Sequence, residues 1–190
     1  DHLDYHLNME NYFMSKRLLF AKRAKKGENF RAVINVDDHY GRRLVREMDA
    51  REQIITYGLL ERADLSATNI QLRADGLKMK VLSPIGDFDV EMPLIGRYNV
   101  LNTLAAIGIG LVHRISREVM AEALGKFTSV PGRLERVDAG QPFSVFVDYA
   151  HTEDAMHNVL VTLREITKKR ILLLFGCGGS RDTGKRAKMG

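Results

Sequence analysis

The sequence predicts an α/β protein, and two features carry this prediction. Helical patterns alternate with short β-branched runs over the first 57 residues and again after residue 131, which is typical of a parallel sheet covered by helices. Between these parts, residues 65–95 hold alternating runs separated by Asp75-Gly76 and by 84–87. That second pattern predicts a small antiparallel meander.

The first part contains four expected elements. A helix is expected over 8–26, because apolar residues fall on one side and Gly27 follows as a stop. A β-branched strand at 31–36, a helix at 38–48 and a strand at 53–57 come next. Asp37 or Asp38 is the expected N-cap of the second helix, since a short carboxylate there accepts from free backbone N–H groups.

The later elements follow in the same way. The meander is expected to use runs 65–74, 77–82 and 88–92, and helices are expected at 99–113 and at 117–127 after Ser116. Val130-Pro131-Gly132 is the best boundary, which divides the chain into 1–130 and 131–190. The second part should hold strands at 134–138 and 144–148, a helix at 154–167 and a buried strand at 170–175.

Composition excludes several classes of protein. The net charge of +5 comes from dispersed or locally clustered basic residues with no aromatic stripe, which disfavours nucleic-acid binding. The longest apolar segment, 100–112, is too short to span a bilayer and contains Asn102, so no membrane insertion is expected. A single cysteine, Cys177, rules out an internal disulfide and favours a reducing, cytoplasmic setting.

A glycine-rich loop, 176–184, follows the apolar run and carries basic side chains in or beside it, including Arg181. Backbone N–H groups in such a loop suit an anion, while a solvated basic turn is the alternative. The loop is not a phosphate-binding P-loop, because Arg186 stands where Ser or Thr would hold Mg²⁺. Cys177 is interpreted as a small residue for tight packing.

Other candidate residues have two interpretations each. His2 and His6 are four residues apart and suit metal binding, but without a third ligand they are more often ordinary hydrogen-bonding groups. Lys16 lies in the first helix and ordinarily extends to solvent, although a buried lysine can serve as a nucleophile. Asn99 is interpreted as a helix cap, whereas Asn102, one turn into the helix, is interpreted as presenting its amide to a ligand.

Two further candidates lie near the proposed boundary. Arg133 follows the Pro131-Gly132 hinge, and Asp148 and His151 stand at the end of the strand at 144–148, which is expected to be buried. Ligands of α/β folds bind at the carboxyl ends of strands, where a carboxylate accepts from ribose hydroxyls and a histidine contacts base or phosphate. The strand ends at Asp148 and Gly176 are therefore expected to converge on one crevice.

Together these motifs resemble the Mur ligases of peptidoglycan synthesis, and the resemblance covers the whole chain. It implies the later part of a central ATPase domain, with a parallel sheet, helices and a small antiparallel meander, over 1–130. The start of a Rossmann-like, amino-acid-binding C-terminal domain would follow over 131–190. The matching motifs are Asp1-His2-Leu3-Asp4-Tyr5-His6, Lys16, Gly96-x-x-Asn99-x-x-Asn102, Pro131-Gly132-Arg133-x-Glu135, Asp148-Tyr149-Ala150-His151-Thr152 and the loop from Gly176.

The resemblance implies an ATP- and Mg²⁺-dependent ligase of the cytoplasm. Its substrates would be UDP-MurNAc-L-Ala-D-Glu and a diamino acid, joined through an acyl phosphate. The loop looks most like that of the ligases that add the third residue of the stem peptide and favours meso-diaminopimelate, with L-lysine still open. The alternatives are another ligase of the superfamily, similar to cyanophycin or folylpolyglutamate synthetases, or a non-catalytic nucleotide-binding module.

The resemblance also implies a role for individual residues. His2 matches a ligand of a second Mg²⁺, and Lys16 matches a lysine that is carbamylated and placed near that metal, which replaces the solvent-exposed interpretation. Arg181 matches an arginine that contacts the carboxylate of the incoming diamino acid. The expected ATP contacts are Asn99, Asn102, Arg133 (phosphates), Asp148 (ribose) and His151.

The chain departs from the family pattern in a few places. Ser180 stands where Asp is usual, Ala187 where Pro is usual, and Glu153 replaces the usual Pro. A Gly-Lys-Thr phosphate loop, a UDP-binding domain and an Asp-Asn-Pro-Arg motif are expected to lie outside these 190 residues. The chain is thus expected to be a fragment and, by itself, inactive.

Overall fold

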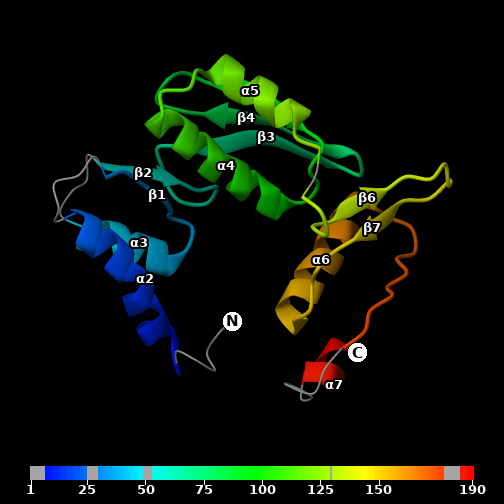
Figure 1. The fold of residues 1–190 in the computed structure, drawn as a ribbon. Coiled ribbons are helices and arrows are strands. Elements are labelled where there is room, and N and C mark those ends of the chain that lie inside the picture. The colour runs from blue at the N-terminus through cyan, green and yellow to red at the C-terminus, as the bar shows by residue number, and fades with distance from the viewer. Residues whose placement is uncertain (1–6, 25–29, 49–52, 129, 178–184) are drawn as a thin grey trace. The chain divides into compact units, whose positions relative to one another are not determined.

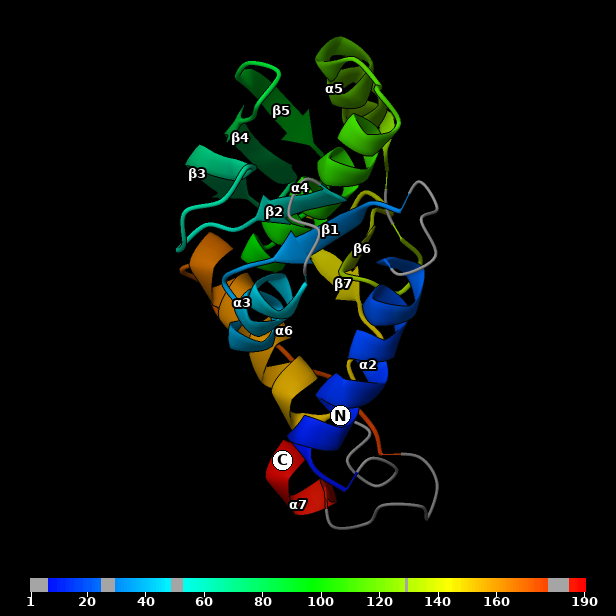
Figure 2. The same cartoon turned by 90° about the vertical axis from the view of Figure 1, so that its left-hand side faces the viewer.

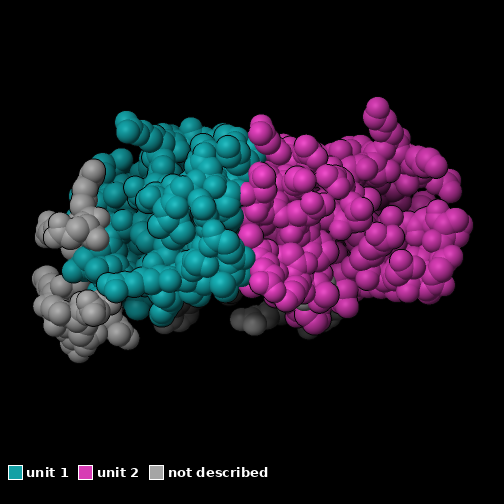
Figure 3. Space-filling model, turned by 90° about the horizontal axis from the view of Figure 1, so that it is seen from above, with its two compact units in different colours: residues 1–68, 80–88, 100–120 teal, residues 69–79, 89–99, 121–190 magenta. Residues whose placement is uncertain are grey.

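The computed structural model describes residues 7–24, 30–48, 53–128, 130–177 and 185–190 (Figure 1). These residues form helices, one parallel strand pair and antiparallel sheets, so the α/β fold class is confirmed. The chain divides into two compact units (Figure 3). Unit 1 holds 1–68, 80–88 and 100–120, and unit 2 holds 69–79, 89–99 and 121–190.

Unit 1 contains a parallel strand pair with its crossover helix (Figure 2). The strands β1 and β2 pair from Ala32 opposite Ile54 to Asn35 opposite Tyr57. Strand β1 alternates between buried and half-buried residues, so one row of its side chains enters the core. The elements are α2 (Met9–Ala24), β1 (Ala32–Asn35), α3 (His39–Glu47) and β2 (Ile54–Tyr57).

The core of this pair is built from both helices and from β1. It contains Phe13 of α2, Ala32 and Ile34 of β1, and Leu44 of α3, each less than 9% exposed. Helix α3 packs closely on the end of β1, since a Cβ at Gly41 would lie 1.8 Å from the carbonyl oxygen of Asn35. Only glycine permits that approach.

Asp38, one of the two expected candidates, is the N-cap of α3. Its carboxylate accepts from the backbone N–H groups of Tyr40 at 2.9 Å and Gly41 at 3.0 Å. These bonds satisfy donors that have no partner within the helix, which explains why α3 begins at this point.

The meander has the strand order β3-β4-β5, as expected from its turn signals. The bounds are β3 (Ser66–Arg73), β4 (Gly76–Leu82) and β5 (Phe88–Met92). In β4 the apolar residues Leu77, Met79 and Val81 are at most 2% exposed, while Lys78 and Lys80 between them are half-buried. This alternation is what the period of two in the sequence predicts.

Two helices follow the meander, α4 (Arg97–Val112) and α5 (Arg117–Lys126). Within unit 1, α4 buries Val100, Leu104 and Ile107. A Cβ at Gly108 would lie 2.5 Å from Val33, so α4 approaches β1 closely at this glycine. Among the described residues, no helix is long and apolar enough to cross a membrane.

The remainder of unit 2 is a strand hairpin and two helices. Strands β6 (Glu135–Val137) and β7 (Val145–Val147) pair antiparallel, with Glu135 opposite Val147. Helix α6 (Glu153–Ile166) begins after Thr152, whose hydroxyl accepts from the N–H of Ala155. Helix α7 (Lys185–Met189) follows the glycine loop.

Two expectations for unit 2 are wrong. The run 171–175 is not a strand, and Leu172 and Leu174 are 78% and 97% exposed. Strand β7 is not fully buried either, since Val147 is 48% exposed. An apolar run forms a buried strand only where a neighbouring strand pairs with its backbone, and no described residue pairs with this one. The expected convergence of two strand ends therefore does not occur in the described structure.

Candidate functional site

The candidate residues of unit 2 gather where the loop after Val130 meets the end of β7. In this loop Gly132 has φ of 68° and Leu134 has φ of 43°, both in the left-handed region. The loop closes on itself by hydrogen bonds from Arg133 N to Val130 O at 3.0 Å and from Gly132 N to the Glu135 carboxylate at 2.8 Å. The backbone conformation is thus fixed on both sides of Arg133.

Asp148 ties this loop to the end of β7. One oxygen of its carboxylate accepts from the N–H of Leu134 and the other from the N–H of Ala150, each at 2.8 Å. The N–H of Tyr149 donates to Gly132 O at 2.7 Å. Each carboxylate oxygen carries a second lone pair, so Asp148 can still accept from a ligand hydroxyl while it holds the loop.

Three side chains lie side by side at this junction. The guanidinium carbon of Arg133 is 5.9 Å from the ring centroid of Tyr149, which is itself 5.1 Å from the ring of His151. The Tyr149 carbonyl oxygen accepts from Nδ1 of His151 at 2.9 Å, which places the ring proton on Nδ1. Tyr149 is 68% exposed, so one flank of this row is open to solvent.

The start of α4 belongs to the same unit. Gly96 has φ of 97°, and a Cβ there would lie 2.8 Å from Thr162 of α6 and 2.8 Å from the ring of Tyr98. Asn99 is 8% exposed, and its side-chain amide donates to Ile95 O at 2.8 Å. Asn99 therefore lies inside the helix rather than at its N-cap, and it fixes the turn that precedes the helix.

Tyr98 responds to the charges of the junction. Its pKa is raised to about 12, mainly by burial and to a lesser extent by the Asp148 carboxylate, while the Arg133 guanidinium opposes the rise. The phenol, the carboxylate and the guanidinium therefore share one electrostatic environment. Apart from its place inside the Gly96-x-x-Asn99 motif, nothing in the sequence indicates this role for Tyr98.

The other predicted site residues lie elsewhere or are not described. Asn102 is an exposed residue of α4, one turn beyond Asn99. Lys16 is an exposed residue of α2, with its Nζ 5.1 Å from the ring centroid of Tyr12. His2 and Arg181 lie outside the described residues. The described part of the chain holds no group of three or more His, Cys, Asp or Glu side chains placed to bind a metal.

The start of the glycine loop is described only as far as Cys177. The Cys177 thiol lies 3.7 Å from the sulfur of Met189 in α7 and is half-buried, which agrees with its interpretation as a packing residue. The residues from 178 to 184, which carry the expected anion-binding backbone, lie outside the described residues.

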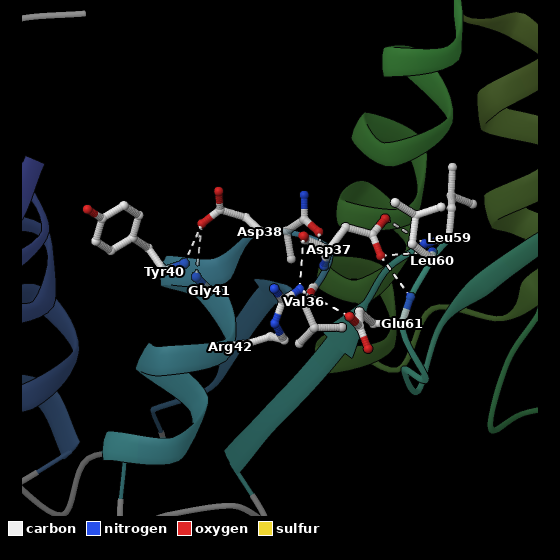
Figure 4. A network of polar contacts seen from close by, with 10 residues as sticks. Val36, Asp37, Asp38, Tyr40, Gly41, Arg42, Leu59, Leu60 and Glu61 are labelled. Carbon is white, nitrogen blue, oxygen red and sulfur yellow. Dashed lines mark hydrogen bonds and ion pairs between the residues drawn. The ribbon is translucent and has the colours of Figure 1, made fainter.

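One polar centre in unit 1 was missed by sequence reasoning (Figure 4). The Asp37 carboxylate accepts from the backbone N–H groups of Leu59 (2.7 Å), Leu60 (2.9 Å) and Glu61 (3.1 Å). Arg42 donates to Asp37 O at 3.0 Å and forms a 3.4 Å ion pair with Glu61. The centre joins the ends of the two parallel strands, and its only sequence signal was a carboxylate two residues after the end of β1.

Two family models match the chain. The Mur ligase middle domain matches residues 1–110, and the Mur ligase glutamate ligase domain matches residues 132–190. Both contain candidate residues: the first contains Lys16, Asn99 and Asn102, and the second contains Arg133 and Asp148.

Curated relatives match over the full length of the chain. The chain is 45% identical to a UDP-N-acetylmuramoyl-L-alanyl-D-glutamate--2,6-diaminopimelate ligase of Solibacter usitatus and 43% identical to one of Thermosynechococcus vestitus. All 190 residues are covered, but they span only 38% of the length of each relative.

Solved structures of Mur ligases also match the chain. A structure of a 2,6-diaminopimelate ligase of this type matches all of the chain and 38% of its own length, with a TM-score of 0.73 and 33% identity. MurF from Acinetobacter baumannii matches 87% of the chain and 35% of its own length with a TM-score of 0.74. At 22% identity, the MurF match supports the fold alone.

Proposed function

The chain belongs to the Mur ligase family, and on that premise we propose that it is part of a cytoplasmic, ATP-dependent ligase of peptidoglycan synthesis. The proposed reaction joins a diamino acid to UDP-MurNAc-L-Ala-D-Glu. The names of the relatives at 43–45% identity support this substrate. Because the chain spans 38% of those relatives, the activity is proposed for the full-length gene product and not for the 190 residues alone.

The observation that carries the proposal is the Asp148 junction of unit 2. Its carboxylate fixes the loop that bears Arg133 and keeps lone pairs for a ribose hydroxyl. Beside it, Arg133 supplies a fixed positive charge for phosphates, and the exposed row of Tyr149 and His151 offers ring surfaces to a base. Asn99 of unit 2 is a further proposed ATP contact, and Asn102 of unit 1 is proposed separately as an ATP contact.

The proposed chemistry needs few proton transfers. The D-glutamate carboxylate attacks the γ-phosphorus of ATP, so that an acyl phosphate forms and ADP leaves. The neutral amine of the diamino acid then attacks the acyl phosphate, and the tetrahedral intermediate gives up phosphate and one amine proton to leave an amide. Positioning of the reactants and neutralisation of charge by groups such as Arg133 supply most of the rate enhancement in a reaction of this kind.

Magnesium is the cofactor that this chemistry implies, and it would neutralise charge on the transferred phosphoryl group. The residues proposed to hold it are His2 and a carbamate on Lys16. The carbamate forms when the neutral Lys16 amine adds to CO₂ and loses a proton, which turns a cationic side chain into an anionic oxygen ligand suited to Mg²⁺. The exposure of Lys16 leaves its amine accessible to CO₂.

The diamino acid is proposed to be meso-diaminopimelate, with Arg181 contacting its carboxylate. Two alternatives differ in the result they predict. An L-lysine-adding ligase, or a ligase similar to folylpolyglutamate synthetases, would retain ATP turnover with a different acceptor. A non-catalytic nucleotide-binding module would bind ATP without releasing phosphate.

The test is phosphate release by the full-length gene product with ATP, Mg²⁺, UDP-MurNAc-L-Ala-D-Glu and either meso-diaminopimelate or L-lysine. We expect turnover with meso-diaminopimelate. Asp148→Asn should raise the KM for ATP by about tenfold, the value of one charge-assisted hydrogen bond. The matched control is Asp138→Asn, which alters an exposed carboxylate in the loop between β6 and β7 and should leave the KM unchanged. ATP binding without phosphate release in the presence of either amino acid would contradict the proposal.

A further inference from the structure

Arg43 of α3 is the centre of an ion-pair chain that runs along α2. Its Nη1 and Nη2 donate to the two carboxylate oxygens of Glu10 at 2.6 and 2.8 Å, and its Nε donates to Glu47 at 2.7 Å. The other oxygen of Glu47 accepts from Arg17 at 2.5 Å. Four side chains thus connect two turns of α2 to one helix face of α3.

The same guanidinium also covers the apolar contact between the helices. Its central carbon lies 4.4 Å from the ring centroid of Phe13, which is 6% exposed. Glu10, Phe13 and Arg17 are spaced three and four residues apart, so they form one stripe on α2. Both ion pairs that reach α2, Arg43 with Glu10 and Glu47 with Arg17, fall on that stripe.

The stripe fixes the rotation of α2 about its own axis. Beyond Phe13, Phe20 also packs against the core of unit 1, whereas Met14, Leu18 and Leu19 are 43–61% exposed, so the ion pairs add to a limited apolar anchor. Lys16 lies about 60° around the helix from Phe13, between the two ends of the ion-pair chain. Any rotation of α2 that broke the pairs would therefore turn Lys16 away from its present direction.

The charges of this chain hold one another in their ionised states. The Arg43 hydrogen bond lowers the pKa of Glu10 and the pKa of Glu47, and the two carboxylates raise the pKa of Arg43. All four side chains are at least partly exposed, and such pairs add little to global stability. Their main effect is on geometry, because the two parallel hydrogen bonds between Arg43 and Glu10 permit one relative orientation of the two side chains.

We propose that Arg43 is a positioning residue for Lys16: through Glu10 and Glu47 it holds α2 in the rotation that presents the Lys16 carbamate for catalysis. The proposal rests on the proposed function, because it is the carbamate of the ligase that Arg43 would orient. Arg43 itself contacts neither substrate nor nucleotide in this scheme.

The test compares Arg43→Met, Arg43→Lys and the control Arg46→Ala in the full-length gene product. Arg46 lies on the same helix and is exposed outside the ion-pair chain. For each variant, kcat, KM for ATP, bicarbonate dependence and melting temperature are measured. Carbon-13-labelled bicarbonate gives an NMR signal of the Lys16 carbamate that does not depend on turnover, and Lys16→Ala identifies that signal.

For Arg43→Met we expect kcat to fall by about tenfold or more with little change in KM, as small misplacements of catalytic groups do. The carbamate signal should require several-fold more bicarbonate. Arg43→Lys keeps the charge without the two-pronged geometry, so its kcat should be intermediate. Arg46→Ala should match wild type. Glu10→Gln should add no further loss to Arg43→Met, since both break the same contact.

Three results would overturn the proposal. The first is an Arg43→Met variant that keeps wild-type kcat and bicarbonate dependence. The second is that Arg43→Met and Arg46→Ala both lose activity, each in proportion to its fall in melting temperature. The third is a wild-type protein that ligates without any carbamate signal, which leaves the proposed ligase reaction standing and removes the carbamate from it. A wild-type protein that does not ligate overturns the proposed function and the positioning role together.

Discussion

Asp148 and Leu134, which are 14 residues apart in sequence, are joined by a 2.8 Å hydrogen bond from the Leu134 N–H to the Asp148 carboxylate. Leu134 has a positive φ of 43° and is 5% exposed, so a strained backbone position coincides with a buried side chain. The bond stabilises a conformation that leucine rarely adopts by itself. It also makes the loop before β6 and the end of β7 a single structural unit.

Removal of the carboxylate should loosen this unit. In Asp148→Ala, two backbone N–H groups lose their acceptor, and we expect a loss of about 1–3 kcal/mol in the free energy of unfolding. Hydrogen exchange at the Leu134 and Ala150 amides is the direct measurement, and both should exchange faster. Unchanged exchange at both amides would show that the carboxylate does not hold the loop.

Gly96 should not tolerate a side chain. Gly96→Ala places a Cβ 2.8 Å from Thr162 and from the ring of Tyr98, at a φ of 97°. Strain and overpacking should together cost about 2 kcal/mol or more, measured by denaturant unfolding. Thr162→Ser removes one of the two clashing groups, so the double variant should recover part of the loss. A Gly96→Ala protein as stable as wild type would contradict the described packing.

Tyr98 should titrate late at alkaline pH. Its folded-state pKa of about 12 lies above the ordinary value of 10.0, so the folded state holds the phenol proton more tightly than the unfolded state does. The resulting stability is present in full below pH about 10 and is lost as pH rises toward about 12. In an alkaline titration followed by tyrosinate absorbance, Tyr98→Phe should remove part of the phase at the highest pH. Asp148→Asn should move that phase to lower pH. A late phase that Tyr98→Phe leaves unaltered would exclude this assignment.

Asp37 and Asp38 offer a matched pair of substitutions. Asp37→Asn places an amide nitrogen among three N–H donors and should cost about 1–3 kcal/mol in unfolding free energy. Asp38→Asn keeps an acceptor at the N-cap, where asparagine is as good as aspartate, so its cost should be near zero. Equal effects of the two changes on thermal unfolding would be evidence against the Asp37 centre.

Local signals predicted most helices and strands to within two or three residues. The Asp38 cap and the turn at Asp75-Gly76 act within a few residues, so the sequence displays them directly. The predicted strand over this apolar run, 171–175, was wrong because strand formation depends on a pairing partner distant in sequence and not on local signals. Its apolar composition is equally compatible with a buried strand and with exposed chain.

The candidate site was predictable as a set of residues and not as a geometry. The Asp148 and Arg133 motifs were visible in the sequence, yet the bonds from Asp148 to Leu134 and Ala150 depend on a folded loop with two positive φ angles. Asp37 and Arg43 carried no motif, since their partners come from distant segments. The functional roles assigned to all of the site residues, including His2 and Arg181, and the boundary at residue 130 stay predictions.

The exposed run 171–175 also bears on how this chain behaves at high concentration. It is short, apolar and free of proline, and its Leu174 is 97% exposed, which are the features of segments that stack into intermolecular β-sheets. Three consecutive cations, Lys168-Lys169-Arg170, stand directly before it. They act as gatekeepers, because stacking copies of the run would bring like charges into register. Salt that screens these charges should therefore promote aggregation of the isolated chain.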